Sequence, residues 1–262
     1  MIKKFLHIFV MLGAISFLAA SPNAMIVFDA SGSMWGQIEG KNKITIAKEA
    51  LRDVVKNWRG GTRLGLMVYG HRKKGDCNDI EVMVPTGANT QATILRKVAA
   101  VSPKGKTPIS RALRQAADAL KFTEDKATVI LISDGKETCD PDPCGTAKAL
   151  KEQGIDFITH VIGFNVDAET DKQLACIAKA TGGAYFSAKN AKELNEAVKT
   201  VAEKVKKKPK TAPLPELTLT AHEEGGKKVD ATHYIYADGK QVGSCSSNVQ
   251  EPCRIGLKIS FC

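Results

Sequence analysis

The sequence predicts an α/β domain with a doubly wound, mostly parallel sheet. Short runs of Val, Ile, Leu and aromatic residues, bounded by Gly, Asp or Pro, recur along the first two hundred residues. Segments with apolar residues at helical spacing separate most of these runs. Because 43% of the 262 residues are apolar, the chain can fill the core that such a sheet needs between two helical layers.

Six segments have the composition of buried strands. They are residues 24–29, 63–69, 80–84, 127–133, 156–163 and 184–187. Only polar residues 70–79 join the second segment to the third, so we expect these two to pair antiparallel, with Ile80–Val84 at an edge. The other connections carry helical patterns, which predict parallel pairing in a six-strand sheet.

Helical periodicity fills the remaining connections. It is clearest from Ile44 to Trp58, where apolar side chains fall on one face at a spacing of 3.6 residues. Further helices are expected over residues 90–101, 109–121, 144–153, 168–181 and 191–205. The predicted α/β domain therefore spans residues 24–205, and ligands should bind outside the carboxyl ends of its strands.

Residues 1–20 are typical of a secretory signal peptide. Lys3 and Lys4 precede an apolar run from Phe5 to Ala20, and cleavage after Ala20 fits better than cleavage after Ala24. The alternative is an uncleaved membrane anchor, although the run is shorter than the ~20 apolar residues that a spanning helix needs. The sequence thus predicts a periplasmic or secreted protein, with no membrane contact beyond the signal peptide.

A linker and a small β unit follow the α/β domain. Residues 206–215 are rich in Lys and Pro, which is typical of an extended linker, and residues 216–262 alternate as strands do. The net charge is +10, and the lysines crowd at positions 204, 206, 207, 208 and 210. A short basic tail differs from a basic face on a folded domain, so nucleic acid is not an expected partner.

The seven cysteines predict disulfides, since the compartment is expected to be oxidising. The pairs considered are Cys139 with Cys144, Cys77 with Cys176, and Cys245 with Cys253, which would leave Cys262 over. Sequence alone leaves the connectivity open. A zinc site built from Cys77, Cys139, Cys144 and His71 is the alternative, although its spacing matches no familiar pattern.

Polar side chains gather where two predicted strands end. Asp29, Ser31 and Ser33 follow the first strand, and Asp134 follows the fourth. If these strands are neighbours, the two carboxylates face each other across one crevice, where Thr107 from the loop 104–108 could join them. The alternative is that the two serines only cap a helix or close a turn.

These five side chains form an all-oxygen set, which suits Mg²⁺ or Mn²⁺ better than Zn²⁺ or Cu²⁺. Only two of the five are charged, so water or an acidic group of a partner would complete the coordination. Trp35 and the loop 34–40 could form a rim that selects the partner, or Trp35 could pack under its own loop. The basic cluster from His71 to Lys74 could favour acidic partners, or it could simply be solvated.

Residues 24–205 resemble the von Willebrand factor A (VWA) domain, a Rossmann-like fold. The resemblance lies in MIVFDASGSM at the first strand, GKTPIS before the third helix and VILISDGKET at the fourth strand. It implies a metal-ion-dependent adhesion site (MIDAS) with Asp29, Ser31, Ser33, Thr107 and Asp134 as ligand positions. It also implies bound Mg²⁺ and a protein partner that offers Asp or Glu.

Enzyme motifs are incomplete. Gly105-Lys106-Thr107 lacks the upstream Gly of a P-loop, because position 100 is Ala, so no nucleotide is expected. A phosphatase that uses Asp29 would need an acid where Ser31 stands. We therefore expect a binding protein and no catalytic residues. The alternatives are a metal-dependent hydrolase of the cell envelope and a scaffold whose metal only stabilises the fold.

Overall fold

The computed structural model describes residues 22–58 and 61–206, and the backbone of several strands between residues 216 and 256. The chain divides into two compact units, and one of them spans Ser21–Lys208. The centre of this unit is a six-stranded sheet in the order β5-β4-β1-β6-β7-β8. Its strands are β1 (Asn23–Asp29), β4 (Arg63–Tyr69), β5 (Ile80–Gly87), β6 (Ala127–Ser133), β7 (Phe157–Phe164) and β8 (Tyr185–Ala188).

The predicted sheet is confirmed, including its one antiparallel strand. β1 pairs parallel with β4 and β6, and β6-β7 and β7-β8 are also parallel. β5 pairs antiparallel with β4 at the edge, and it carries Pro85. β1 therefore lies between β4, which is the next strand of this sheet along the chain, and β6, which comes later. The strand order reverses at this point, as expected for a doubly wound sheet.

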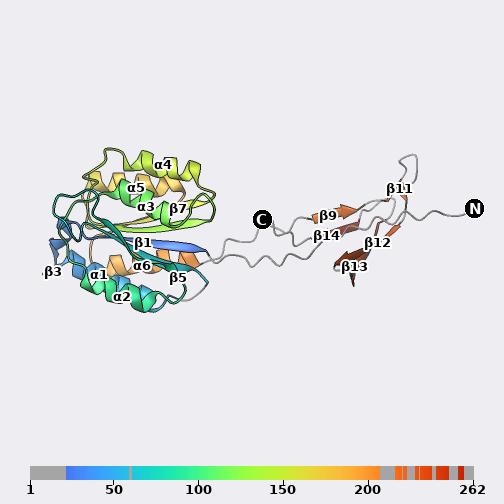
Figure 1. Cartoon of the computed structure of the whole chain (residues 1–262), viewed down its shortest axis with the longest axis horizontal. Coiled ribbons are helices and arrows are strands. Elements are labelled where there is room, and N and C mark those ends of the chain that lie inside the picture. The colour runs from blue at the N-terminus through green and yellow to red at the C-terminus, as the bar shows by residue number, and fades with distance from the viewer. Residues whose placement is uncertain are drawn as a thin grey trace, which may run out of the picture. The chain divides into compact units, whose positions relative to one another are not determined.

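Helices cover both faces of the sheet (Figure 1). The layer on one face consists of α1 (Lys43–Lys56), α2 (Gln91–Ala100) and α6 (Ala191–Lys206). The opposite layer consists of α3 (Ile109–Ala119), α4 (Pro143–Gln153) and α5 (Ala168–Thr181). The observed helices agree with the predicted ones to within about two residues at each end, which is the ordinary uncertainty of helix boundaries. None of the described helices is both long and apolar enough to cross a membrane.

β1 is buried on both faces, as a central parallel strand should be. Ile26 and Phe28 belong to the apolar cluster beneath α1, α2 and α6. Met25 and Val27 alternate with them and belong to the cluster beneath α3, α4 and α5. Asp29 ends the strand and has no exposed surface, so the two cores lead directly into the polar edge of the sheet.

Three short elements between β1 and α1 were not predicted. A 3-10 helix, η1 (Gly32–Trp35), is followed by the small hairpin of β2 (Gln37–Ile38) and β3 (Lys41–Asn42). Elements of two to four residues are too short to show a hydrophobic period. Just before them, Ser31 forms an isolated parallel bridge to Gly105.

The predicted disulfide pairs within the α/β unit are wrong. Cys77 pairs with Cys139, and Cys144 pairs with Cys176, with Cα atoms 5.7 and 5.6 Å apart. The first bond joins the loop before β5 to the loop after β6, which meet at the carboxyl edge of the sheet. The second joins α4 to α5, which pack side by side. The expectation was wrong because the sequence does not show which of these loops and helices the fold brings together in three dimensions.

The remaining strands lie beyond residue 215 and form antiparallel pairs. They are β9 (Glu216–Leu219), β10 (Ala221–His222), β11 (Lys228–Val229), β12 (Ala231–Ala237), β13 (Lys240–Ser247) and β14 (Cys253–Gly256). The side chains of Cys245 and Cys253 lie outside the described part of the structure, as do Cys262, the predicted signal peptide 1–20 and linker residues 207–215.

Truncation of Leu131 to Ala should destabilise the α/β unit by about 2–5 kcal/mol, because Leu131 is fully buried in β6 and its removal leaves a cavity. Ile155→Ala should change stability by less than about 0.5 kcal/mol, since Ile155 is 63% exposed. Urea denaturation of both variants measures the difference. Equal losses in the two would contradict the assigned core.

Candidate metal centre

The two carboxylates of the candidate site lie at the ends of neighbouring strands. Asp29 is the last residue of β1, and Asp134 directly follows Ser133, the last residue of β6. Because β1 and β6 run parallel and adjacent, both strands deliver a carboxylate to the same edge of the sheet. The sequence-based expectation that Asp29 and Asp134 share one crevice agrees with this arrangement.

A chain of short hydrogen bonds connects the two carboxylates. Asp29 Oδ1 accepts from the Ser31 backbone N–H at 2.7 Å, and Asp29 Oδ2 accepts from Ser133 Oγ at 2.6 Å. The hydroxyls of Ser31 and Ser33 lie 2.9 Å apart, and Ser33 Oγ donates to Asp134 Oδ1 at 2.6 Å. Both serines therefore turn toward the carboxylates rather than only closing a turn.

Thr107 reaches the same place from the loop before α3. A methyl group placed on Gly135 would lie 3.3 Å from Ser33 Oγ and 3.4 Å from Thr107 Oγ1, so both hydroxyls lie close to this glycine. The loop is fixed by the Gly32 N–H, which donates to the Gly105 carbonyl at 3.0 Å, and by the Thr107 N–H, which donates to Thr138 Oγ1 at 2.8 Å. All five predicted ligand positions thus come together.

Burial and like charge act together on Asp29. Its carboxyl group is fully buried, and burial together with the negative charge of Asp134 raises the pKa of Asp29 to about 6. Hydrogen bonds from Ser133 and Ser31 act in the opposite direction. Tyr69, whose hydroxyl donates to Ser133 Oγ at 3.0 Å, is also buried, and its pKa is raised well above the ordinary value. The buried Asp29 carboxyl group is therefore costly to ionise.

The donor set fits a hard cation. Carboxylate and hydroxyl oxygens are ligands that Mg²⁺ and Mn²⁺ accept. In the part of the chain that the structure describes, no group of three or more His, Cys, Asp or Glu side chains could hold a metal ion. The alternative zinc site is wrong, because Cys77, Cys139 and Cys144 are all in disulfides.

Lys43 is a site residue that the sequence analysis missed. Its Nζ donates to Asp134 Oδ2 at 3.0 Å and to the Asn165 carbonyl at 3.2 Å. Lys43 is the first residue of α1, and a helix that follows a central parallel strand begins at the carboxyl edge of the sheet. Its position at the start of this helix could have indicated that Lys43 lies near the site, but many lysines at helix starts point into solvent.

The loop between β4 and β5 forms one wall of the site. Asp79 is buried and accepts from the backbone N–H groups of Arg72 and Lys73 at 2.7 and 2.8 Å, and from Arg72 Nε at 2.7 Å. Burial alone would raise the pKa of Asp79, but these hydrogen bonds outweigh it and the pKa is lowered. Gly70 has a φ of +70°, and a Cβ there would lie 2.6 Å from the Lys106 carbonyl, so only glycine fits this close approach.

The predicted partner rim is present in part. Trp35 is 50% exposed, and its indole Nε1 donates to the Pro103 carbonyl at 2.9 Å, which fixes the ring beside the site. The side chain of His71 is only 8% exposed and pairs with Glu81 at 3.1 Å, so it does not offer its ring to the rim. Exposed cations of the surrounding loops include Arg72, Lys73, Lys74, Lys104, Lys106 and Lys136.

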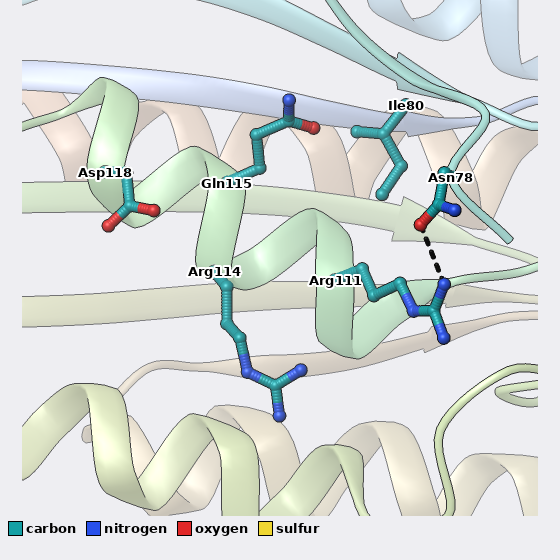
Figure 2. A pocket seen from close by; sticks show the side chains of 6 residues that line it. All are labelled: Asn78, Ile80, Arg111, Arg114, Gln115 and Asp118. Carbon is teal, nitrogen blue, oxygen red and sulfur yellow. Dashed lines mark hydrogen bonds between the residues drawn. The ribbon is translucent and has the colours of Figure 1, made fainter.

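A pocket of about 360 Å³ lies along α3, where Arg111 projects beside Asn78 and Arg114 projects from another turn of the helix (Figure 2). Arg111 Nη1 donates to Asn78 Oδ1 at 2.7 Å, and both arginines pair with Asp140 at 3.3–3.4 Å. These cations therefore already have anionic or polar partners. The pocket includes none of the five candidate ligands, so it is separate from the candidate metal centre.

Comparisons with known proteins agree with this architecture. The sequence profile of the von Willebrand factor type A domain matches residues 23–200. The Bacillus subtilis (strain 168) protein YwmD is 32% identical over 194 residues, which is 71% of this chain and 87% of that protein.

Solved structures share the fold at low sequence identity. Proximal thread matrix protein 1 (PTMP1) from the mussel byssus has a TM-score of 0.55 at 22% identity, covering 71% of this chain and 47% of that one. The von Willebrand factor domain of the type V pili tip protein Mfa5 from Porphyromonas gingivalis has a TM-score of 0.57 at 13% identity, covering 74% and 99%.

This chain thus spans about half the length of the mussel protein. A further structure of that protein, with a TM-score of 0.53 at 22% identity and covering 70% of this chain and 46% of that one, is described as having a zinc occupied MIDAS motif. The match of the sequence profile over most of the chain and the six-strand sheet lead to one conclusion: the chain belongs to the von Willebrand factor type A domain family.

Proposed function

We propose that this chain is a secreted or periplasmic protein-binding module whose metal centre captures an acidic side chain of a partner protein through Mg²⁺ or Mn²⁺. The observation that carries the proposal is the convergence of two buried carboxylates and three hydroxyls at one edge of the sheet. Domains of this family typically bind proteins, which agrees with the proposal.

The ion would be held by Asp29, Ser31, Ser33, Thr107 and Asp134. When bound, it supplies a positive charge to which a partner's carboxylate can coordinate. Without it, Asp29 and Asp134 would repel an incoming carboxylate, so we expect partner binding to depend on the metal. Zn²⁺ should also be tested for binding, because the mussel protein is described with zinc in its MIDAS motif. The all-oxygen donor set nevertheless favours Mg²⁺ and Mn²⁺ over Zn²⁺.

Binding is a better interpretation than hydrolysis. A hydrolase would need a general base near the metal. Among the described residues, His71 pairs with Glu81, and His160, which lies within β7, accepts from the Ala184 N–H through Nδ1. Lys43 is within reach of the site, but it forms an ion pair with Asp134 and has no free lone pair. We therefore propose no catalytic residues.

Export from the cytoplasm is part of the proposal. The two disulfides of the α/β unit suit an oxidising compartment, and residues 1–20 have the composition of a signal peptide. Ala24 is buried within β1 and pairs with Leu64 of β4. Cleavage after Ala24 would remove the first paired residues of the sheet, so cleavage after Ala20 is the expected position.

Calorimetry should detect Mg²⁺ or Mn²⁺ binding to the mature chain with a dissociation constant in the micromolar to millimolar range. Asp29→Ala should abolish it, and Thr107→Val should weaken it about tenfold, because each removes an oxygen from the donor set. Asp53→Ala is the control, since Asp53 is exposed on α1 away from the strand ends. Unchanged binding in both site variants would contradict the proposed ligands, and metal binding without any metal-dependent capture would favour a stabilising role in a scaffold.

In EDTA, the wild-type protein should lose stability relative to Asp29→Asn as the pH rises. The pKa of Asp29 is raised to about 6 in the folded state from its ordinary 3.8. Its contribution to the free energy of unfolding is therefore fully present below the unfolded-state pKa of 3.8 and is lost as the pH rises through the folded-state pKa of about 6. Between pH 4.5 and 7.5 the loss is about 2 kcal/mol. Urea denaturation at the two pH values measures it. Saturating Mg²⁺ should restore stability at pH 7.5, and identical pH dependence in the two proteins would contradict the assignment.

A synthetic peptide of alternating Asp and Gly should bind in Mg²⁺ and not in EDTA, and the matching Asn peptide should not bind. The double variant Lys73→Glu, Lys104→Glu should weaken binding of the Asp peptide about tenfold, because both lysines are exposed on loops beside the site. Trp35→Ala should also weaken it, whereas Ile155→Ala should not. Fluorescence anisotropy of a labelled peptide measures all of these. Equal binding of the Asp and Asn peptides would contradict capture of a carboxylate.

A further inference from the structure

Lys43 shares a carboxylate with the candidate metal centre. The Asp134 side chain is fully buried, and each of its oxygens has a different partner. Oδ1 accepts from Ser33 Oγ at 2.6 Å, and Oδ2 accepts from Lys43 Nζ at 3.0 Å. The Lys43 side chain is only 12% exposed, so its ammonium group is held inside the site rather than in solvent.

The surroundings hold the ammonium group in place. The Lys43 N–H donates to the Gly36 carbonyl at 2.7 Å, and a Cβ on Gly36 would lie 3.3 Å from Lys43 Cε, so the lysine side chain passes close over this glycine. Asn165 has a left-handed backbone with a φ of +51°, and its carbonyl accepts from Lys43 Nζ at 3.2 Å. Asparagine tolerates this conformation better than most residues. Three separate segments therefore position one cation.

We propose that Lys43 is an internal cation of the site, which neutralises Asp134 in the metal-free protein and lowers the affinity of the centre for divalent ions. This inference rests on the proposed function. A metal ion that uses Asp134 shares that carboxylate with the ammonium group, so two positive charges are held by one buried group. The positive end of the α1 dipole, which begins at Lys43, adds to the repulsion.

The arrangement has two opposite effects. In the metal-free protein, Lys43 offsets the repulsion between Asp29 and Asp134 and so stabilises the fold. In the metal-bound protein, it opposes the ion. The site is therefore tuned to fill only where divalent ions are abundant, and it stays folded where they are scarce.

The test compares Lys43→Met and Lys43→Gln with the wild-type chain by Mg²⁺ and Mn²⁺ calorimetry. Both variants remove the positive charge. Gln keeps a hydrogen-bond donor for Asp134, so this variant should still fold if Lys43→Met fails to fold because the carboxylate is left unpaired. Each should bind Mg²⁺ at least about tenfold more tightly than wild type. Lys41→Met is the matched control, because Lys41 forms an exposed ion pair with Glu49 and should leave the affinity unchanged.

A second measurement follows the thermal unfolding midpoint with and without Mg²⁺. In EDTA the Lys43 variants should unfold at a lower temperature than wild type, and saturating Mg²⁺ should raise their midpoint by more than it raises that of wild type. A merely structural lysine would lower stability in both conditions and would not increase metal affinity.

The outcomes separate the two proposals. Metal binding by all proteins with equal affinity, or weaker binding by both Lys43 variants, overturns the role of Lys43 and leaves the proposed function standing. Absence of metal binding in wild type and in every variant overturns the proposed function, and the inference about Lys43 falls with it.

Discussion

The arrangement of the site follows from the repulsion between two buried carboxylates, which the parallel pairing of β1 and β6 brings together. Each strand ends in a carboxylate, and both carboxylates are buried at one edge of the sheet. Serine hydroxyls and the Lys43 ammonium group reduce the energy of placing these charges side by side. The remaining cost, from burial and like charge, is expressed as the raised pKa of Asp29. A divalent cation would do the same more completely, which is why the geometry favours a metal centre.

The loops around the site are fixed by contacts of their own. Asp79 organises the turn after β4 through three short hydrogen bonds, and Gly70 lets that turn approach the loop before α3. The disulfide between Cys77 and Cys139 then joins this turn to the loop after β6. These contacts tie together the loops around the candidate ligands, so the proposed partner would meet a preformed surface.

The fold and the convergence of the five candidate residues could be predicted because both depend on local pattern. Strand composition, helical period and polar residues at strand ends are visible in the sequence, and parallel pairing brings such ends together. The disulfide pairs, the burial of His71 against Glu81 and the approach of Lys43 to Asp134 could not be predicted. They depend on how separate loops meet, and a lysine at the start of a helix has the same sequence signal whether it is buried or solvated.

The edges of the six-strand sheet bear on how the domain meets other proteins. β5 carries Pro85, which has no N–H to offer a further strand, and the opposite edge strand, β8, has only four residues. Both features discourage pairing of an extended peptide with the sheet. Neighbouring copies of the domain are therefore not expected to join through their backbones, and under the proposed function recognition is left to the side chains at the carboxyl ends of the strands.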